Sequence, residues 1–282
     1  MGRIALITAI VLAASQAWTA DLSAAGLSIE PGGLLLQDIP IGEARSVVES
    51  SGISFVVHNR DGISHEYRIS AHRPSEAGNG KCAKGYCEIP DASWIKPAPD
   101  VLTIPPGSSA SFDVVIDLPD DGRLYNQKWI AVLAVESVPT PGANVALALY
   151  PALQIETMAS DLAQARPLGS VAVAPATLRA DAGSDTLAFE VYNNDILAHG
   201  YVIHVAPPGG KIPVSPGLRA AEGDDFVVPR SPRLWVEAGG RGLVLLDMGP
   251  AAEKRLDSWE QLVFVESEAG ECTFVRLQMV SD

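Results

Sequence analysis

The side chains best suited to chemistry in this sequence are two histidines, each preceded by an asparagine and an aspartate. At one offset of 134 residues, the matched positions are Asn59/Asn193, Asp61/Asp195, His65/His199 and Tyr67/Tyr201. Imidazole and carboxylate groups can hold a metal ion, and two copies would give two sites. Alternatively, the asparagine and aspartate bond to a turn backbone, and the histidine begins the next strand. We favour the turn, because a duplication preserves structural residues as readily as ligands, and we expect no metal or other cofactor.

Two tryptophans recur in the same way, within segments that are otherwise apolar. Trp129-Ile-Ala-Val-Leu-Ala-Val-Glu-Ser137 matches Trp259-Glu-Gln-Leu-Val-Phe-Val-Glu-Ser267. Such indole rings could stack on a sugar, but their even spacing from Leu133 and Val263 is typical of a strand that faces a core. We therefore expect Trp129 and Trp259 to be core residues.

A long irregular segment, residues 73–98, carries two of the three cysteines. In an exported chain we expect Cys82 and Cys87 to form a disulfide, which leaves Cys272 as a free thiol or an intermolecular bridge. The matching segment of the second module differs completely, so this loop is our preferred contact region for a partner. Its candidate contact residues are Arg73, Lys81, Lys84, Tyr86, Trp94 and Lys96.

No motif of a common enzyme class is present. The sequence lacks a Gly-x-Ser-x-Gly elbow, a phosphate-binding loop and a dinucleotide fingerprint. The net charge of −14 argues against nucleic acid or anionic lipid as a partner, since both require basic patches. These observations predict a non-enzymatic protein.

The elements that position these residues are short strands separated by turns. Apolar residues alternate with polar ones in segments such as Ala110–Leu118, and the 25 glycines and 21 prolines suit turn-rich β structure. The repeat indicates two related modules. We predict an all-β chain of two immunoglobulin-like β-sandwich domains in tandem, at residues 26–158 and 169–282, with a linker at 159–168.

The first 20 residues have the layout of a secretory signal peptide. A basic start at Arg3 precedes an apolar run from Ile4 to Ala14, and this run is too short to span a bilayer. Ser15-x-Ala17 fits the small-x-small cleavage rule, and a cut after Ala20 is the alternative. We expect an exported protein, periplasmic or extracellular, with no membrane insertion after signal cleavage.

The strand that ends in Val-x-Asn59, together with Pro105-Pro-Gly-Ser-Ser-Ala-Ser-Phe-Asp-Val114, resembles bacterial extracytoplasmic immunoglobulin-like domains. Two such domains behind a signal peptide also resemble the periplasmic chaperones of pilus assembly. That resemblance implies a basic pair on the first and last strands of domain one. Residues 27–39 and 145–155 contain no lysine or arginine.

The function that we expect is therefore protein binding or a structural role in the cell envelope or the extracellular space. The partner would be an envelope protein or an extracellular assembly. The alternative is a pilus-assembly chaperone-like factor that binds client subunits by edge-strand pairing.

Overall fold

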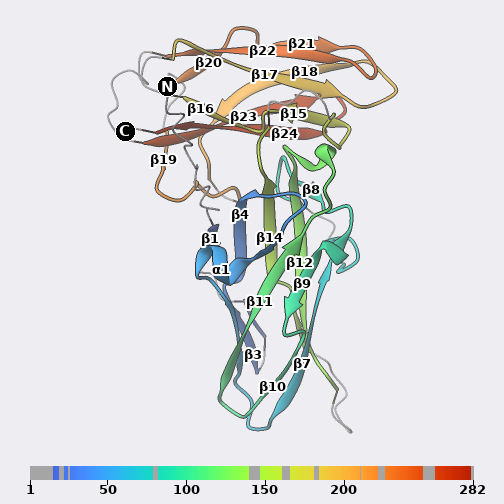
Figure 1. Ribbon diagram of the computed structural model, residues 1–282, viewed down its shortest axis with the longest axis vertical. Coiled ribbons are helices and arrows are strands. Elements are labelled where there is room, and N and C mark those ends of the chain that lie inside the picture. Colours follow the sequence, from blue (N-terminus) through green and yellow to red (C-terminus); the bar gives the residue numbers. More distant parts are fainter. Residues whose placement is uncertain are drawn as a thin grey trace, which may run out of the picture.

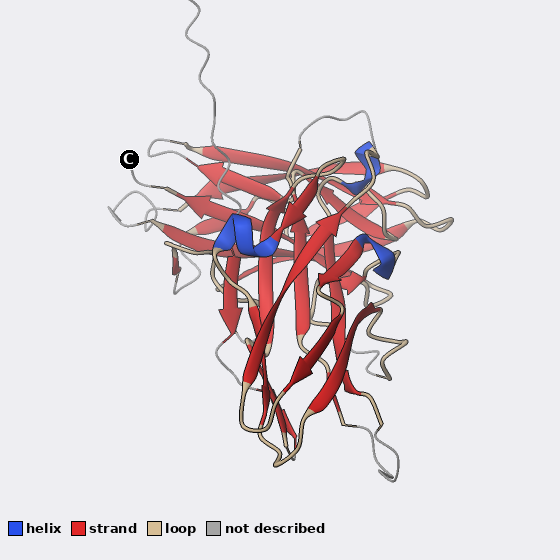
Figure 2. Cartoon of the chain, turned by 60° about the horizontal axis from the view of Figure 1, so that its bottom comes forward, coloured by secondary structure: helices blue, strands red, loops and turns tan. Residues whose placement is uncertain are grey.

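A computed structural model gives the fold of the chain. It describes residues 15–18, 22–24, 26–78, 82–139, 147–160, 166–180, 184–209, 211–221, 226–249 and 258–280. Most of the predicted signal peptide, Lys81 and part of the predicted linker lie outside these residues. Strands dominate the described chain, as expected for an all-β protein (Figure 2).

The first domain is a sandwich of two sheets. One sheet has the spatial order β1 (Ser15–Trp18), β4 (Gly33–Ile39), β14 (Ala152–Thr157), β12 (Lys128–Ser137), β7 (His65–His72) and β10 (Val101–Ile104), and β13 (Ala148–Leu149) and β8 (Cys87–Glu88) pair with β12. The other has the order β2 (Leu22–Ala24), β3 (Leu27–Glu30), β6 (Phe55–Asn59), β11 (Ser109–Asp117) and β5 (Ala44–Ser46), and β9 (Ile95–Ala98) pairs with β11. The described residues of the domain also form three short helices: α1 (Val47–Ser51), η1 (Ala92–Trp94) and η2 (Gly122–Leu124).

The second domain is a sandwich with an equivalent strand order. One sheet contains β15 (Val171–Ala174), β17 (Thr186–Asn193), β22 (Arg241–Met248) and β20 (Val227–Pro229). The other contains β16 (Thr177–Ala180), β24 (Cys272–Met279), β23 (Trp259–Ser267), β18 (His199–Ala206) and β21 (Arg233–Val236), and β19 (Arg219–Ala220) pairs with β23. The order β16-β24-β23-β18-β21 corresponds to β4-β14-β12-β7-β10 of the first domain. The second sandwich lies across one end of the first (Figure 1).

In each domain the chain changes sheets at a proline near the N-terminal end of the sandwich. A cis peptide bond precedes Pro31 between β3 and β4, and another precedes Pro175 between β15 and β16. After the crossing, β4 runs parallel to β14 and β16 runs parallel to β24. The segments β3–β4 and β15–β16 therefore each contribute to both sheets of their domain.

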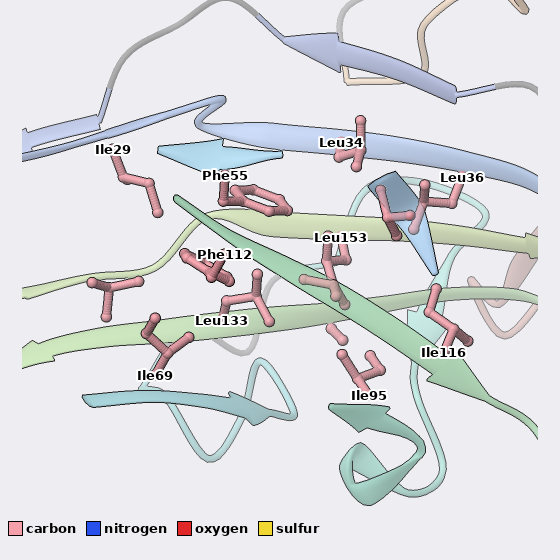
Figure 3. Packing of buried hydrophobic residues seen from close by; sticks show 14 of the residues in the cluster. Ile29, Leu34, Leu36, Phe55, Ile69, Ile95, Phe112, Ile116, Leu133 and Leu153 are labelled. Carbon is pink, nitrogen blue, oxygen red and sulfur yellow. The ribbon is translucent and has the colours of Figure 1, made fainter. Parts of the chain in front are cut away.

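Each sandwich has its own apolar core, built by the alternation of buried and exposed positions. In β11, Phe112, Val114 and Ile116 point inward and are at most 2% exposed, whereas the intervening side chains are less buried. Phe112 stacks on Phe55, with 5.3 Å between ring centroids (Figure 3). Among the described residues, no helix is long and apolar enough to cross a membrane.

Candidate binding site at the domain junction

The repeated asparagines hold the turn that follows each of the strands β6 and β17. The Asn59 side-chain amide donates to the carbonyls of Ile63 at 2.8 Å and Ile104 at 2.9 Å, and its oxygen accepts from the Asp61 backbone. Asn193 makes the corresponding bonds to Leu197 at 2.7 Å and to Val236 at 3.1 Å. Both asparagines are almost fully buried. These contacts give the repeated asparagines a structural role in both domains.

The repeated histidines pair with the repeated aspartates. The distance from His65 Nε2 to Asp61 Oδ2 is 2.9 Å, and the His199–Asp195 distance is the same. Each ring also lies against the tyrosine two positions on, Tyr67 or Tyr201, and both tyrosines are core residues. Within the described part of the chain, no three histidine, cysteine or acidic side chains form a group that could hold a metal ion. Each motif is thus a pair that joins a turn to the next strand.

The repeated tryptophans lie in the two cores. Trp129 is 1% exposed and packs against Trp94, while Trp259 is 0% exposed and packs against Phe226. Buried rings of this kind cannot stack on an external sugar. Trp94, which we predicted as a partner contact, packs against the core of the first domain.

The other candidate contact residues of the loop divide between the two domains. Arg73 donates to the Pro90 carbonyl, and Lys96 pairs with Asp117 on the neighbouring strand. In contrast, Lys84 and Tyr86 contact the second domain of the same chain. Lys81 lies outside the described residues. A role of this loop in binding a separate partner stays a prediction.

The three cysteines are free thiols in the structure. The bridge that we predicted between Cys82 and Cys87 is therefore not formed in it, and this pairing stays a prediction. Cys82 and Cys272 both pack against the apolar cluster between the domains. Burial raises the pKa of Cys272 to about 11, so this thiol is protonated at neutral pH.

An apolar cluster joins the two domains. The first domain contributes Ala83, Tyr86 and Ile130, and the second contributes Ile212, Leu262, Phe264 and Phe274. Tyr86 meets Phe274 edge to face, with 5.5 Å between ring centroids. At its rim, Lys84 forms a 2.8 Å ion pair with Glu266 and lies over the Phe264 ring. The loop at residues 73–98 of the first domain thus helps to hold the second domain against the first.

A buried ionic network lies beside this cluster, centred on Arg276 of β24. The guanidinium is 0% exposed, and it lies 2.6 Å from Glu156 of the first domain and 2.6 Å from Glu260 of the second. The Tyr86 hydroxyl donates to Glu156, and the Ser215 hydroxyl donates to Glu260. One arginine therefore pairs with two buried carboxylates, one from each domain.

The charges in this network depend on one another. Burial opposes ionisation of Glu156, but the charges of Arg276 and Lys128 and the hydrogen bonds from Arg276 and Tyr86 together hold the pKa of the carboxyl below its ordinary value. Burial likewise acts against the charge of Arg276, and Glu156 and Glu260 together raise its pKa well above the ordinary value. Glu156 and Arg276 therefore each favour the charged form of the other.

Lys128 is a second buried cation, on β12 of the first domain. It is 4% exposed, and its Nζ makes no hydrogen bond within the described structure. The amine lies over the ring of Phe274, 4.7 Å from the centroid. Burial lowers the pKa of Lys128 to about 8. Burial therefore disfavours the charged form of this lysine, although its charge favours the ionised form of the nearby Glu156.

Two cavities of about 600 Å³ each flank the junction. The first is lined by residues that include Lys84, Lys128, Glu266 and Cys272. The second is lined by Gln37 and Asp38 of β4, together with Arg179, Ser215 and Gln278 of the second domain. Both contain charges of each sign, so neither is a dedicated site for an anion or a cation.

Sequence reasoning missed the network, although the strands carry a signal for it. Arg276 lies in the run Phe274-Val-Arg-Leu277, and Glu260 follows Trp259 in another apolar strand. A charged residue within a buried strand requires a partner of opposite charge. The sequence does not reveal that the partner of Arg276 lies in the other domain.

The comparisons with known proteins bear on the fold alone. No protein-family model matches the chain, and no curated protein matches its sequence. Among solved structures, it is similar to a protein of unknown function from Porphyromonas gingivalis W83, at 12% identity over 90% of this chain and 99% of that chain, with a TM-score of 0.36. It is also similar to the periplasmic chaperone SfaE, at 11% identity over 91% of this chain and all of that chain, with a TM-score of 0.32. A PapD-like domain of human CEP192 matches 48% of this chain at 12% identity, with 87% of that domain covered and a TM-score of 0.34.

Proposed function

We propose that the chain is a non-enzymatic, exported protein that binds another protein of the cell envelope or of an extracellular assembly. In this proposal its two immunoglobulin-like sandwiches act as one bent scaffold. The observation that carries it is the junction: a fully buried arginine shared between carboxylates of the two domains. A buried network of this kind favours one relative orientation, because separating its members would leave unpaired charges.

The buried titratable groups support a structural role. Glu156 and Glu260 each form an ion pair with Arg276. Each repeated histidine pairs with its aspartate. A catalytic acid or base must reach a substrate within hydrogen-bond distance. Arg276 instead pairs with Glu156 and Glu260 inside the protein.

The alternative is a chaperone-like factor that binds client subunits along an edge strand. Such a protein would hold the client's terminal carboxylate with a basic pair on its first and last strands. At the junction, β4 and β14 present Gln37, Gln154 and Glu156, and the nearby Arg276 is already neutralised. An edge strand of either sandwich could pair with a client strand, which supports this alternative. The side chains at the junction argue against binding of the client's terminal carboxylate by a basic pair.

Photo-crosslinking in exporting cells tests the proposed function. We would place p-benzoylphenylalanine at Tyr150, Lys96, Ile196 and Trp235, one variant each, because all four side chains are exposed. We expect one defined protein to crosslink at a subset of adjacent positions. An exported, folded chain that yields no crosslinked protein from any of the four positions would contradict the proposal.

A further inference from the structure

The edge of strand β4 is occupied by a segment that export is expected to remove. Strand β1 runs antiparallel to β4, with Ser15 opposite Leu36 and Trp18 opposite Gly33. This strand lies within the predicted signal peptide. A cut after Ala17 removes three of its four residues, and a cut after Ala20 removes all four.

Removal of β1 leaves one side of β4 unpaired. Among the described strands, β4 pairs with β14 on one side and with β1 on the other. The next strand, β2, begins at Leu22, after both candidate cleavage sites, and is paired with β3. Cleavage therefore opens the β4 edge and leaves the neighbouring β3 edge covered.

The opened edge lacks the features that usually protect a strand from new partners. The stretch from Gly32 to Gln37 contains no charged residue and no proline. The equivalent strand of the second domain, β16, carries Arg179, whose side chain is 64% exposed. An uncharged, unpaired edge is a template for strand addition.

The ends of the edge define the length of the segment that fits. The edge begins after Pro31, where the chain crosses from one sheet to the other. It ends at Asp38, which has a φ of 52° and lies where the β4–β14 register shifts. Between them β1 pairs with four residues, which corresponds to roughly 13 Å of extended chain. Because β1 is antiparallel to β4, the N-terminal side of an added strand leads toward Gln37 and Asp38, which line the second junction cavity.

We propose that signal-peptide cleavage uncovers β4 as a docking edge for a short, uncharged, extended segment of a partner protein, which binds antiparallel to β4. This inference rests on the proposed function and names the surface that would perform it. The full chain has a net charge of −14, and removal of the leader takes away only the basic Arg3, so repulsion between processed copies disfavours a second copy as the occupant. Self-association is therefore a separate outcome of the test.

Peptide binding to processed and unprocessed chain tests the proposal. The probe is a labelled peptide with the sequence of residues 13–20, Ala-Ala-Ser-Gln-Ala-Trp-Thr-Ala. The processed chain keeps every residue of the three apolar clusters, the first of which is Leu27. In the unprocessed chain the tethered β1 competes at an effective concentration of about 1 mM. For a peptide Kd of about 10–100 μM, the processed chain should therefore bind the peptide about 10- to 100-fold more tightly.

Backbone methylation separates strand pairing from side-chain binding without altering the protein. Successive amides of a strand point in opposite directions, so N-methylation at Gln16 and at Ala17 must have unequal effects. We expect one methylated peptide to lose at least about tenfold in affinity and the other to bind nearly as well as the parent peptide. Equal effects of the two methyl groups would overturn edge pairing.

Two further outcomes would also overturn the proposal. If the processed chain stays monomeric and does not bind the peptide, β4 is not a docking edge. If the processed chain dimerises and the peptide dissociates the dimer, the occupant is a second copy. Crosslinks at Lys96, Ile196 or Trp235 without one at Tyr150, which lies two residues before the Gly33 partner Ala152, would leave the proposed function standing and remove β4 from it.

Discussion

Replacement of Arg276 by methionine is the sharpest test of the domain junction. The substitution keeps a long side chain but removes the charge that Glu156 and Glu260 share, at 2.6 Å from each. Removing one partner of a buried ion pair costs about 3–5 kcal/mol, because the remaining charges stay buried without compensation. We expect Arg276→Met to lower the free energy of unfolding at pH 7 by that amount, measured by urea denaturation.

The pH dependence of this loss identifies its cause. In the native protein the pKa of Glu156 lies below 4.5, so its contribution to stability is present above that value and is lost as the pH falls through the folded pKa. Without Arg276, burial dominates and raises the pKa of Glu156, so the variant becomes less stable as the pH rises. The difference between the two proteins should therefore be largest near neutral pH and should narrow below about pH 4.5.

Arg179→Met is the matched control. Arg179 also bridges the domains, through Asp38 at 3.4 Å, but its side chain is 64% exposed. Exposed ion pairs contribute about 0–1 kcal/mol. If Arg276→Met costs no more than this control, or if its cost does not depend on pH, the buried network does not stabilise the junction.

Three further predictions concern separate parts of the structure. Burial lowers the pKa of Lys128 to about 8, so Lys128→Met should raise the free energy of unfolding at pH 7 by about 2–3 kcal/mol. This gain should shrink as the pH rises from 8 to 10.5. Equal stability of the variant and the native protein at pH 7 would contradict this prediction. Asn59→Ala and Asn193→Ala should each cost about 2–3 kcal/mol in denaturation experiments, because each removes bonds to several buried carbonyls, and unequal costs would contradict their equivalent roles. In the exported protein, non-reducing mass spectrometry should find Cys82 and Cys87 linked in one peptide, and free thiols at both positions would refute that pairing.

Much of the fold could be predicted from the sequence because it depends on local patterns. Alternation in Ala110–Leu118 predicted the strand that is observed as β11 (Ser109–Asp117), and the paired copies predicted β7 and β18. Alternation fixes which side chains face a core, whichever sheet lies opposite. It does not reveal the short helix α1, which depends on the Ser46 side chain accepting a hydrogen bond from Glu49 and on Gly52 at φ 72°.

The junction could not be predicted, because it depends on how two domains meet. The loop at residues 73–98 was expected to be irregular and available to a partner, whereas its β9 pairs with β11 and its Tyr86 contacts Phe274. No periodicity within one strand encodes a contact between residues 190 positions apart, such as Tyr86 and Arg276. The buried arginine was visible in the sequence, but its partner was not.

Residue-resolved hydrogen exchange at β4 tests the central claim most directly. In the unprocessed chain, amides of Leu34 to Leu36 that bond to β1 should be protected, and in the processed chain the same amides should exchange about 100-fold faster while those of β14 do not change. Addition of the peptide of residues 13–20 to the processed chain should restore the protection. Identical exchange at β4 in the two forms, or no recovery with the peptide, would contradict the claim that processing opens a docking edge.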